Sequence, residues 1–118
     1  YSIGQKQSAI HHIFPKSSFP RIAMYIENLI ALTSAQHLQE AHPGGNTRKI
    51  DKDFQYTCLI CKADRIKKNI EGEAGIPVKY SFSDFMFVLD VGLSTDYFEQ
   101  LEENDFNAVL AGIEANYS

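Results

Sequence analysis

The adjacent histidines His11 and His12 constrain the fold most, because they lie inside a short apolar run that Pro15 ends. Apolar and β-branched residues bounded by polar residues and a proline predict a strand over 8–14. Neighbouring side chains on a strand point to opposite faces, so the two imidazoles cannot both face one side of a sheet. We therefore expect His11 and His12 to have two different roles.

A second strand is predicted over 28–33, after a loop over 16–21 that is rich in serine and proline. The connection between the strands is too short for a crossover helix, so we expect them to be antiparallel. A short helix is predicted over 35–41, and the proline and glycines of 42–45 must end it. The order is therefore strand, long loop, strand, short helix.

The rest of the chain is predicted to be helical, which makes the fold class α+β. An apolar stripe at helical spacing predicts a helix over 51–70, with Tyr56, Leu59, Ile60, Ala63, Ile66 and Ile70. Phe54, Cys58 and Cys61 lie opposite that stripe, so we expect this helix to pack on both faces. After a break at 72–77 and a brief extended piece at 78–80, three helices are expected over 83–91, 95–103 and 105–116. Ser94 and Asn104 are the expected N-caps of the last two.

The length of 118 residues, 44% of them hydrophobic, suits one compact domain that folds without disulfides. The chain has neither an apolar run long enough for a membrane span nor a secretory signal, so we expect a cytoplasmic protein and no membrane partner. Because the sequence does not begin with Met, we also expect it to be part of a longer polypeptide.

Charge is divided unevenly along the chain, although the net charge is −4. All 11 Lys and Arg lie at or before Lys79, with seven acidic residues there, whereas the stretch from Asp84 to Glu114 carries eight acidic residues. The net charge argues against a general nucleic-acid binder. The division permits a basic binding surface beside an acidic face that is solvated or meets another protein.

The four histidines suggest a metal site, since all of them lie between positions 11 and 42. A histidine at the end of a strand and another in the helix after the hairpin can meet at one point, which makes His11 and His37 candidate metal ligands. The side chain of His12 projects from the other face of the strand, close to the end of the strand. Because an imidazole can accept a proton at neutral pH, His12 is the candidate general base.

These residues resemble the HNH endonucleases of the ββα-metal (His-Me finger) superfamily, which include the nuclease domains of DNase colicins. The resemblance covers roughly residues 8–42, in the order Ile10-His11-His12-Ile13, Asn28-Leu29-Ile30, His37 and His42. It implies a ββα-metal core over 1–50 with a helical extension over 51–118. It also implies that His11 and His37 hold the metal, that His12 is the base, and that Asn28 ties the loop to the strand so that the base is held in place.

His42 departs from the family's pattern, in which a second helix ligand follows the first by four positions. His42 follows His37 by five, so it reaches the metal only if the helix unwinds before Pro43. Glu40 is the substitute ligand if His42 is not used.

The resemblance implies hydrolysis of a DNA phosphodiester bond with a single divalent ion, leaving 5′ phosphate and 3′ hydroxyl ends. Imidazole ligands suit Zn²⁺, Ni²⁺, Co²⁺ or Mn²⁺ better than Mg²⁺. The cations expected to line the DNA backbone are Lys16, Arg21, Arg48 and Lys49, with a second basic cluster at Lys62, Arg65, Lys67 and Lys68. Cys58 and Cys61 have no second cysteine pair, so we expect small buried side chains there rather than a structural zinc.

Three interpretations stay open at this point. The first is an endonuclease acting on DNA in restriction, phage defence or a mobile element. The second is a non-catalytic metal-binding or nucleic-acid-binding module that retains the ββα-metal shape. The third is a toxin nuclease restrained by its acidic tail or by a regulatory protein, and an additional domain of the same polypeptide or a homodimer is compatible with each.

Overall fold

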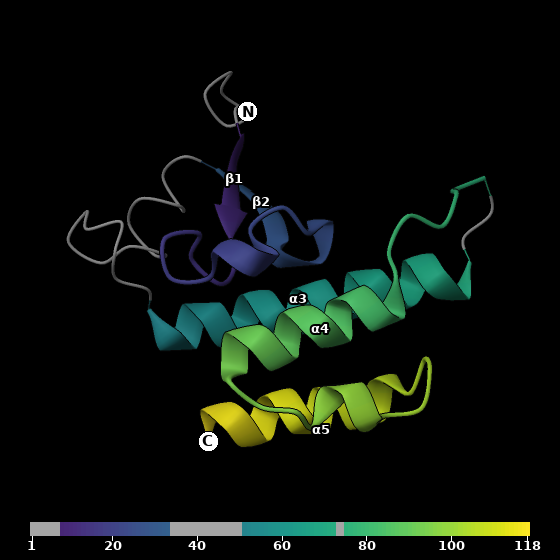
Figure 1. The fold of residues 1–118 in the computed structure, drawn as a ribbon. Helices are drawn as coiled ribbons and strands as arrows, with labels where there is room; N and C mark the ends of the chain where they lie inside the picture. Colours follow the sequence, from purple (N-terminus) through teal and green to yellow (C-terminus); the bar gives the residue numbers. More distant parts are fainter. Residues whose placement is uncertain (1–7, 34–50, 73–74) are drawn as a thin grey trace.

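The computed structural model of the protein describes residues 8–33, 51–72 and 75–118. These residues form a small mixed α+β fold, which confirms the predicted class. An antiparallel hairpin lies on one side of helices α3 and α4, and helix α5 lies on their other side (Figure 1). The elements are β1 (Ser8–His12), β2 (Leu29–Thr33), α3 (Lys52–Glu71), α4 (Phe82–Leu93) and α5 (Phe106–Tyr117). The helix predicted over 35–41 lies outside the described residues.

The hairpin pairs β1 with β2 antiparallel, as predicted, in a register that places His11 opposite Ile30 and His12 opposite Leu29. The first strand ends at His12, two residues earlier than predicted. The backbone N–H of Ile13 still donates to the Asn28 carbonyl at 2.8 Å, but the N–H of Phe14 donates to the Asn28 side chain instead of to a strand partner. Between the strands the chain makes two 3-10 turns, Pro20–Ile22 and Ile26–Asn28.

A two-stranded hairpin is at best marginally stable by itself, so this one depends on what it packs against. The loop that follows β1 supplies the contact, since Ile13, Phe14 and Ile22 are at most 1% exposed. The ring of Phe14 lies directly against Gly92 of α4, where an added Cβ would come within 2.5 Å of the ring. This close aromatic contact is one of those that hold the hairpin on the helical part.

Helix α3 matches its prediction to within a residue at each end. Asp51 caps it by accepting the backbone N–H groups of Asp53 and Phe54 at 2.9 and 3.1 Å. The predicted packing on both faces is only partly right. Cys58 is buried, but Cys61 is exposed.

Helix α4 begins and ends close to the predicted positions, but Ser94 was assigned the wrong role. Ser81 caps the N-terminus by accepting the Asp84 N–H at 3.2 Å. Ser94 lies after the last turn in the left-handed region, with φ of 56°, so it ends α4 and begins no helix.

The helix predicted over 95–103 is wrong, since this stretch contains only the 3-10 turn η5 (Phe98–Gln100). The reason is a tertiary contact. The Asp90 carboxylate accepts the backbone N–H groups of Phe98 and Glu99, both at 2.9 Å, and draws the chain back onto α4. Asn104 is also not the N-cap of α5. It has a φ of 66°, and the next residue, Asp105, caps the helix by accepting the Ala108 N–H at 3.2 Å.

Across the described ranges, no helix is both long enough and apolar enough to cross a membrane.

Candidate functional site

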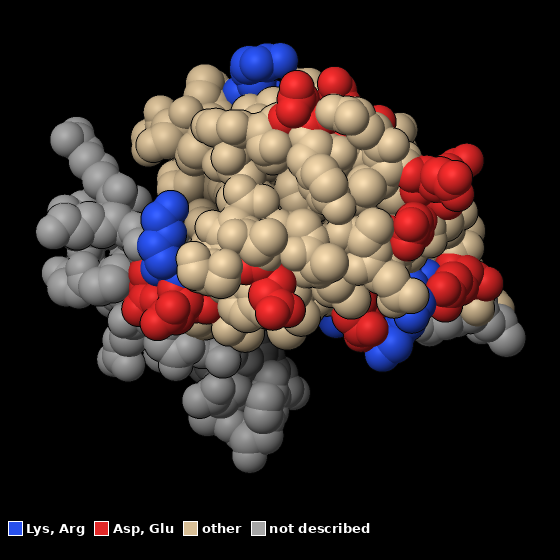
Figure 2. All heavy atoms as spheres, turned by 90° about the horizontal axis from the view of Figure 1, so that it is seen from below, with Lys and Arg blue, Asp and Glu red and all other residues tan. Residues whose placement is uncertain are grey.

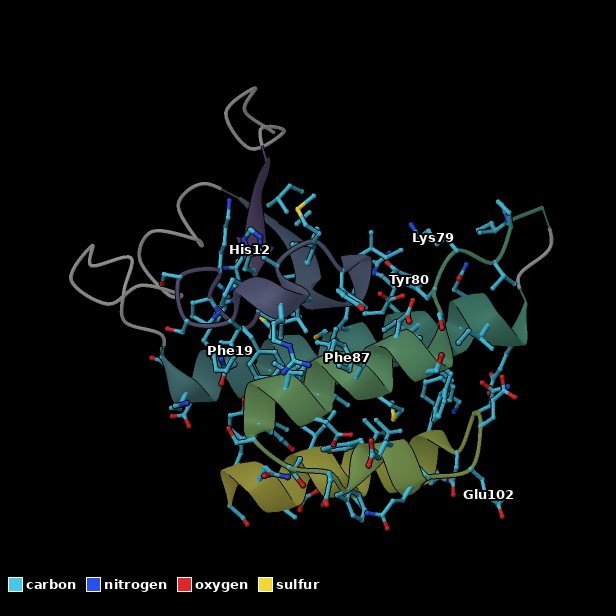
Figure 3. The ribbon with its side chains drawn as sticks, viewed as in Figure 1. His12, Phe19, Lys79, Tyr80, Phe87 and Glu102 are labelled. Atoms are coloured by element: carbon cyan, nitrogen blue, oxygen red, sulfur yellow. The ribbon has the colours of Figure 1, made fainter. Side chains whose placement is uncertain are left out.

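His11 and His12 end β1 in two different environments. His11 is 1% exposed, and its ring centroid lies 6.2 Å from that of Phe54 on α3. His12 is partly exposed and lies on the hairpin side of the molecule (Figure 3). One imidazole therefore faces the interior, whereas the other can reach water and a substrate.

Asn28 joins the two ends of the long loop between the strands. It is fully buried, and its Oδ1 accepts the backbone N–H of Phe14 at 2.8 Å. Its Nδ2 donates to the carbonyls of Phe14 and Ile22, at 3.1 and 3.3 Å. Together with the bond from Ile13 to the Asn28 carbonyl, these contacts hold the backbone that immediately follows His12. The predicted position of Asn28 is thus one from which a side chain can fix the end of β1.

A second brace reaches the same backbone from the helices. The Nε2 of Gln55, on α3, donates to the Ile13 carbonyl at 2.9 Å. The hydroxyl of Tyr117, on α5, donates in turn to the Gln55 Oε1. Burial, and secondarily the nearby Cys58, raises the pKa of the Tyr117 phenol, so that this donor keeps its proton. A chain of hydrogen bonds thus runs from α5 to the residue after His12.

Glu27 fixes the other end of the loop. Its side chain is 3% exposed, and its Oε2 accepts the backbone N–H of Ser81 at 3.0 Å. Ser81 caps α4, so this carboxylate lies at the positive end of a helix, where a negative charge is stabilised. The loop between the strands is therefore anchored both to α3 and to α4.

Neither Gln55 nor Glu27 was expected from the sequence. The available signal for Gln55 was its place four residues before Leu59, on the apolar side of α3. For Glu27 it was the position directly before Asn28. These positions suggest burial, but they do not reveal the partner.

The predicted backbone-binding cations are only partly described. Lys16 is exposed in the loop. The guanidinium carbon of Arg21 lies 5.3 Å from the ring centroid of Phe87, and Arg21 borders an open groove along α4 together with Asp90 and Glu99. Arg48 and Lys49 lie outside the described residues. Contact of any of these residues with DNA stays a prediction.

The predicted metal ligands His37 and His42, and the substitute Glu40, also lie outside the described residues. Within 8–33, 51–72 and 75–118, no group of three or more His, Cys, Asp or Glu side chains could hold a metal ion. His11 supplies one buried imidazole, so the remaining donors of a metal site would have to come from the other parts of the chain. Imidazole donors at 11, 37 and 42 fit a transition metal chemically.

Comparison with protein family models gives no match, and neither curated proteins nor solved structures include one that matches this chain. A function must therefore be inferred from the burial of His11, the partial exposure of His12 and the hydrogen bonds of Asn28.

Proposed function

We propose that this protein is a metal-dependent endonuclease of the ββα-metal type that hydrolyses DNA phosphodiester bonds. The observation that supports this most is the bonding of Asn28. The resemblance to HNH endonucleases requires an asparagine that ties the loop to the strand carrying the base. Asn28 makes three buried side-chain bonds to the backbone of that loop. Two of them are to Phe14, two residues after His12, and the third is to Ile22.

His12 is the general base of the proposed reaction. Its imidazole accepts a proton from water, whose oxygen forms a bond to phosphorus while the bond from phosphorus to the 3′ oxygen breaks. The partial exposure of His12 supports this role, because a base must reach both water and substrate. The braces from Asn28 and Gln55 limit how far its backbone can shift, which favours a fixed geometry of attack.

His11, His37 and His42, or Glu40 in place of His42, would hold the divalent ion. When bound, such an ion polarises the phosphate and stabilises the negative charge that develops on it. The burial of His11 supports a role as ligand, since a ligand needs no access to substrate. Lys16, Arg21, Arg48 and Lys49 would then contact flanking phosphates.

The test is a cleavage assay on plasmid DNA with Mn²⁺, Ni²⁺, Zn²⁺ or Mg²⁺ added. We expect His12→Ala to lower the cleavage rate by about 10²- to 10⁴-fold, the usual contribution of a general base, while metal binding measured by calorimetry is retained. Asn107→Ala, at an exposed position on α5, is the matched control and should cleave at the wild-type rate.

Cleavage by purified His12→Ala at the wild-type rate would contradict the role of His12. Binding of both metal and DNA by the wild-type protein, without cleavage in any metal, would identify a non-catalytic module instead.

A further inference from the structure

An open groove runs between the hairpin and α3, and all of its charged lining residues lie beyond the region of the resemblance. Both strands supply apolar side chains to its lining, α3 supplies the polar and charged ones that face them, and Lys79 and Tyr80 also line it. Among the described residues, four cations line it, Lys62, Arg65, Lys68 and Lys79, and Asp64 is the one acidic side chain there. Asp64 already pairs with Lys68 at 3.0 Å. The groove is therefore strongly positive.

Lys62 is the informative member of this set, because it is only 5% exposed. Its Nζ donates to the hydroxyl of Tyr80 at 2.9 Å and lies 4.4 Å from the centroid of that ring. Among the described residues, the one ion pair is that of Lys68 with Asp64, so no carboxylate there pairs with Lys62. A buried ammonium without a counter-charge is costly, and an anion in the groove would offset that cost.

The groove is held in a fixed shape by α3. Asn69 is buried, and its Oδ1 accepts the backbone N–H groups of Lys79 and Tyr80 at 2.8 and 3.2 Å. Its Nδ2 donates to the Pro77 carbonyl at 3.0 Å. The Nζ of Lys79 then lies 5.2 Å from the centroid of the Tyr80 ring, so two ammonium groups lie near one aromatic side chain. These bonds bring the like charges together before any ligand arrives.

The position of the groove indicates which anion it meets. Lys79 and Tyr80 lie on the same side of α3 and α4 as His12, whereas Glu102 lies on the opposite side (Figure 3). Seen from the α5 side, the middle of the face is uncharged, and acidic side chains, with a few Lys and Arg, lie along its margins (Figure 2). A polyanion that reaches His12 is thus drawn toward the groove and repelled from the far face.

We propose that this groove binds a backbone phosphate of the nucleic acid, with Lys62, Arg65 and Lys79 as its contacts. The inference rests on the proposed function, since the phosphate belongs to the DNA that His12 cleaves. It adds to that function a second contact region on α3, through which substrate flanking the cleaved bond is held.

The test measures binding of a labelled DNA duplex in EDTA, where no cleavage occurs, over a series of salt concentrations. Loss of one phosphate contact lowers the slope of log K against log salt by about one. We expect Lys79→Glu and Arg65→Glu each to weaken binding by about 10-fold or more at low salt and to reduce this slope. Lys52→Glu makes the same charge change at an exposed position on α3 that does not line the groove, and should have a much smaller effect.

Lys62→Met separates a binding role from a structural one, because Met replaces a buried charge with an apolar side chain of similar length. We expect its melting temperature to be unchanged or higher and its DNA affinity to be lower. Equal affinities and salt slopes for the wild type, Lys79→Glu and Lys52→Glu would overturn the proposed role of the groove even if the protein cleaves DNA. Binding that depends on Lys79 and Arg65 without any cleavage would support the groove and contradict the nuclease.

Discussion

Replacing Asn28 with aspartate tests how the end of β1 is held, because the two side chains have the same shape. Oδ1 can still accept the Phe14 N–H, but the amide that donates to the carbonyls of Phe14 and Ile22 is lost. The Phe14 carbonyl is left without a donor, which costs about 1–3 kcal/mol for a buried group. The Ile22 carbonyl still accepts the backbone N–H of Tyr25, so it loses one bond worth about 0.5–1.5 kcal/mol. Together they predict a loss of about 1.5–4.5 kcal/mol in the free energy of unfolding, out of about 5–15 kcal/mol for a domain.

The loss should depend on pH, since position 28 is fully buried. A carboxylate there is desolvated and faces two carbonyl oxygens, so the pKa of the introduced Asp is raised in the folded state. A raised folded pKa means that the unfolded chain releases its proton first. The deficit relative to wild type is therefore smallest below pH ~3.9, the ordinary value for Asp, and grows as pH rises toward the folded pKa. At low pH the protonated acid can donate to one of the two carbonyls, so the variant regains part of the lost stability.

Urea unfolding between pH 4 and pH 8 measures this change in the free energy of unfolding directly. In thermal unfolding, with about 2.1 cal/mol/K of unfolding entropy per residue, each kcal/mol corresponds to about 4 °C in Tm for this chain length. Asn69→Asp is the matched control, because it is also buried but loses a donor to a single carbonyl, that of Pro77. Because this bond is only partly buried and Pro77 is exposed, the change should cost about 0.5–1.5 kcal/mol and leave cleavage at saturating DNA unchanged.

The catalytic consequence separates the two variants. Asn28→Asp, assayed where it is folded, should cleave about 10²-fold more slowly, because displacing His12 by about 1 Å can cost that much. Wild-type stability at pH 7 would show that the two bonds donated by the Asn28 amide do not stabilise the protein in solution. Lower stability with an unchanged cleavage rate would show that Asn28 does not position His12.

Three further changes test the supports of the same loop. Gly92→Ala should cost about 1–3 kcal/mol in urea unfolding and slow cleavage, because its Cβ meets the Phe14 ring, whereas Gly112→Ala, which meets Tyr97 and Phe98, should cost stability alone. Gln55→Leu should cost about 1–3 kcal/mol and lower the cleavage rate, because the Ile13 carbonyl loses its donor; an unchanged rate would exclude a positioning role. Tyr117→Phe should lower the free energy of unfolding by about 1 kcal/mol at pH 8. Above pH 10.0, the ordinary pKa of Tyr, the wild type loses stability because its folded pKa is raised, so the difference between the two proteins should narrow. An unchanged difference at pH 10.5 would contradict this.

The sequence predicted the elements whose cause is local. Helix α3 has an apolar stripe and an N-terminal Asp51, and the hairpin has β-branched residues and a proline after its first strand, so both were predicted nearly in full. The stretch over 95–103 shows the limit. Its residues permit a helix, but the Asp90 carboxylate binds two of its backbone N–H groups from a neighbouring helix, and no local pattern carries that information.

The candidate site divides in the same way. Asn28 was placed from the order of residues in the motif, and its bonds span 14 positions at most. Gln55 acts on Ile13 across 42 positions, and Glu27 acts on Ser81 across 54. A polar side chain on a helix or turn has the same sequence pattern whether it faces water or a distant carbonyl. Such braces become visible only when the packing of the hairpin on α3 and α4 is known.

The helical part therefore gives the hairpin what two strands cannot supply by themselves. Gln55 and Glu27 fix the loop to α3 and α4, and the ring of Phe14 packs against Gly92. The same helices also divide the charge, because no Lys or Arg follows Lys79, and the acidic stretch forms α4, η5 and α5. If DNA binds as proposed, its approach from the hairpin side follows from this division, since the face opposite His12 repels phosphates. The helices would then set both the rigidity of the base and the direction from which its substrate arrives.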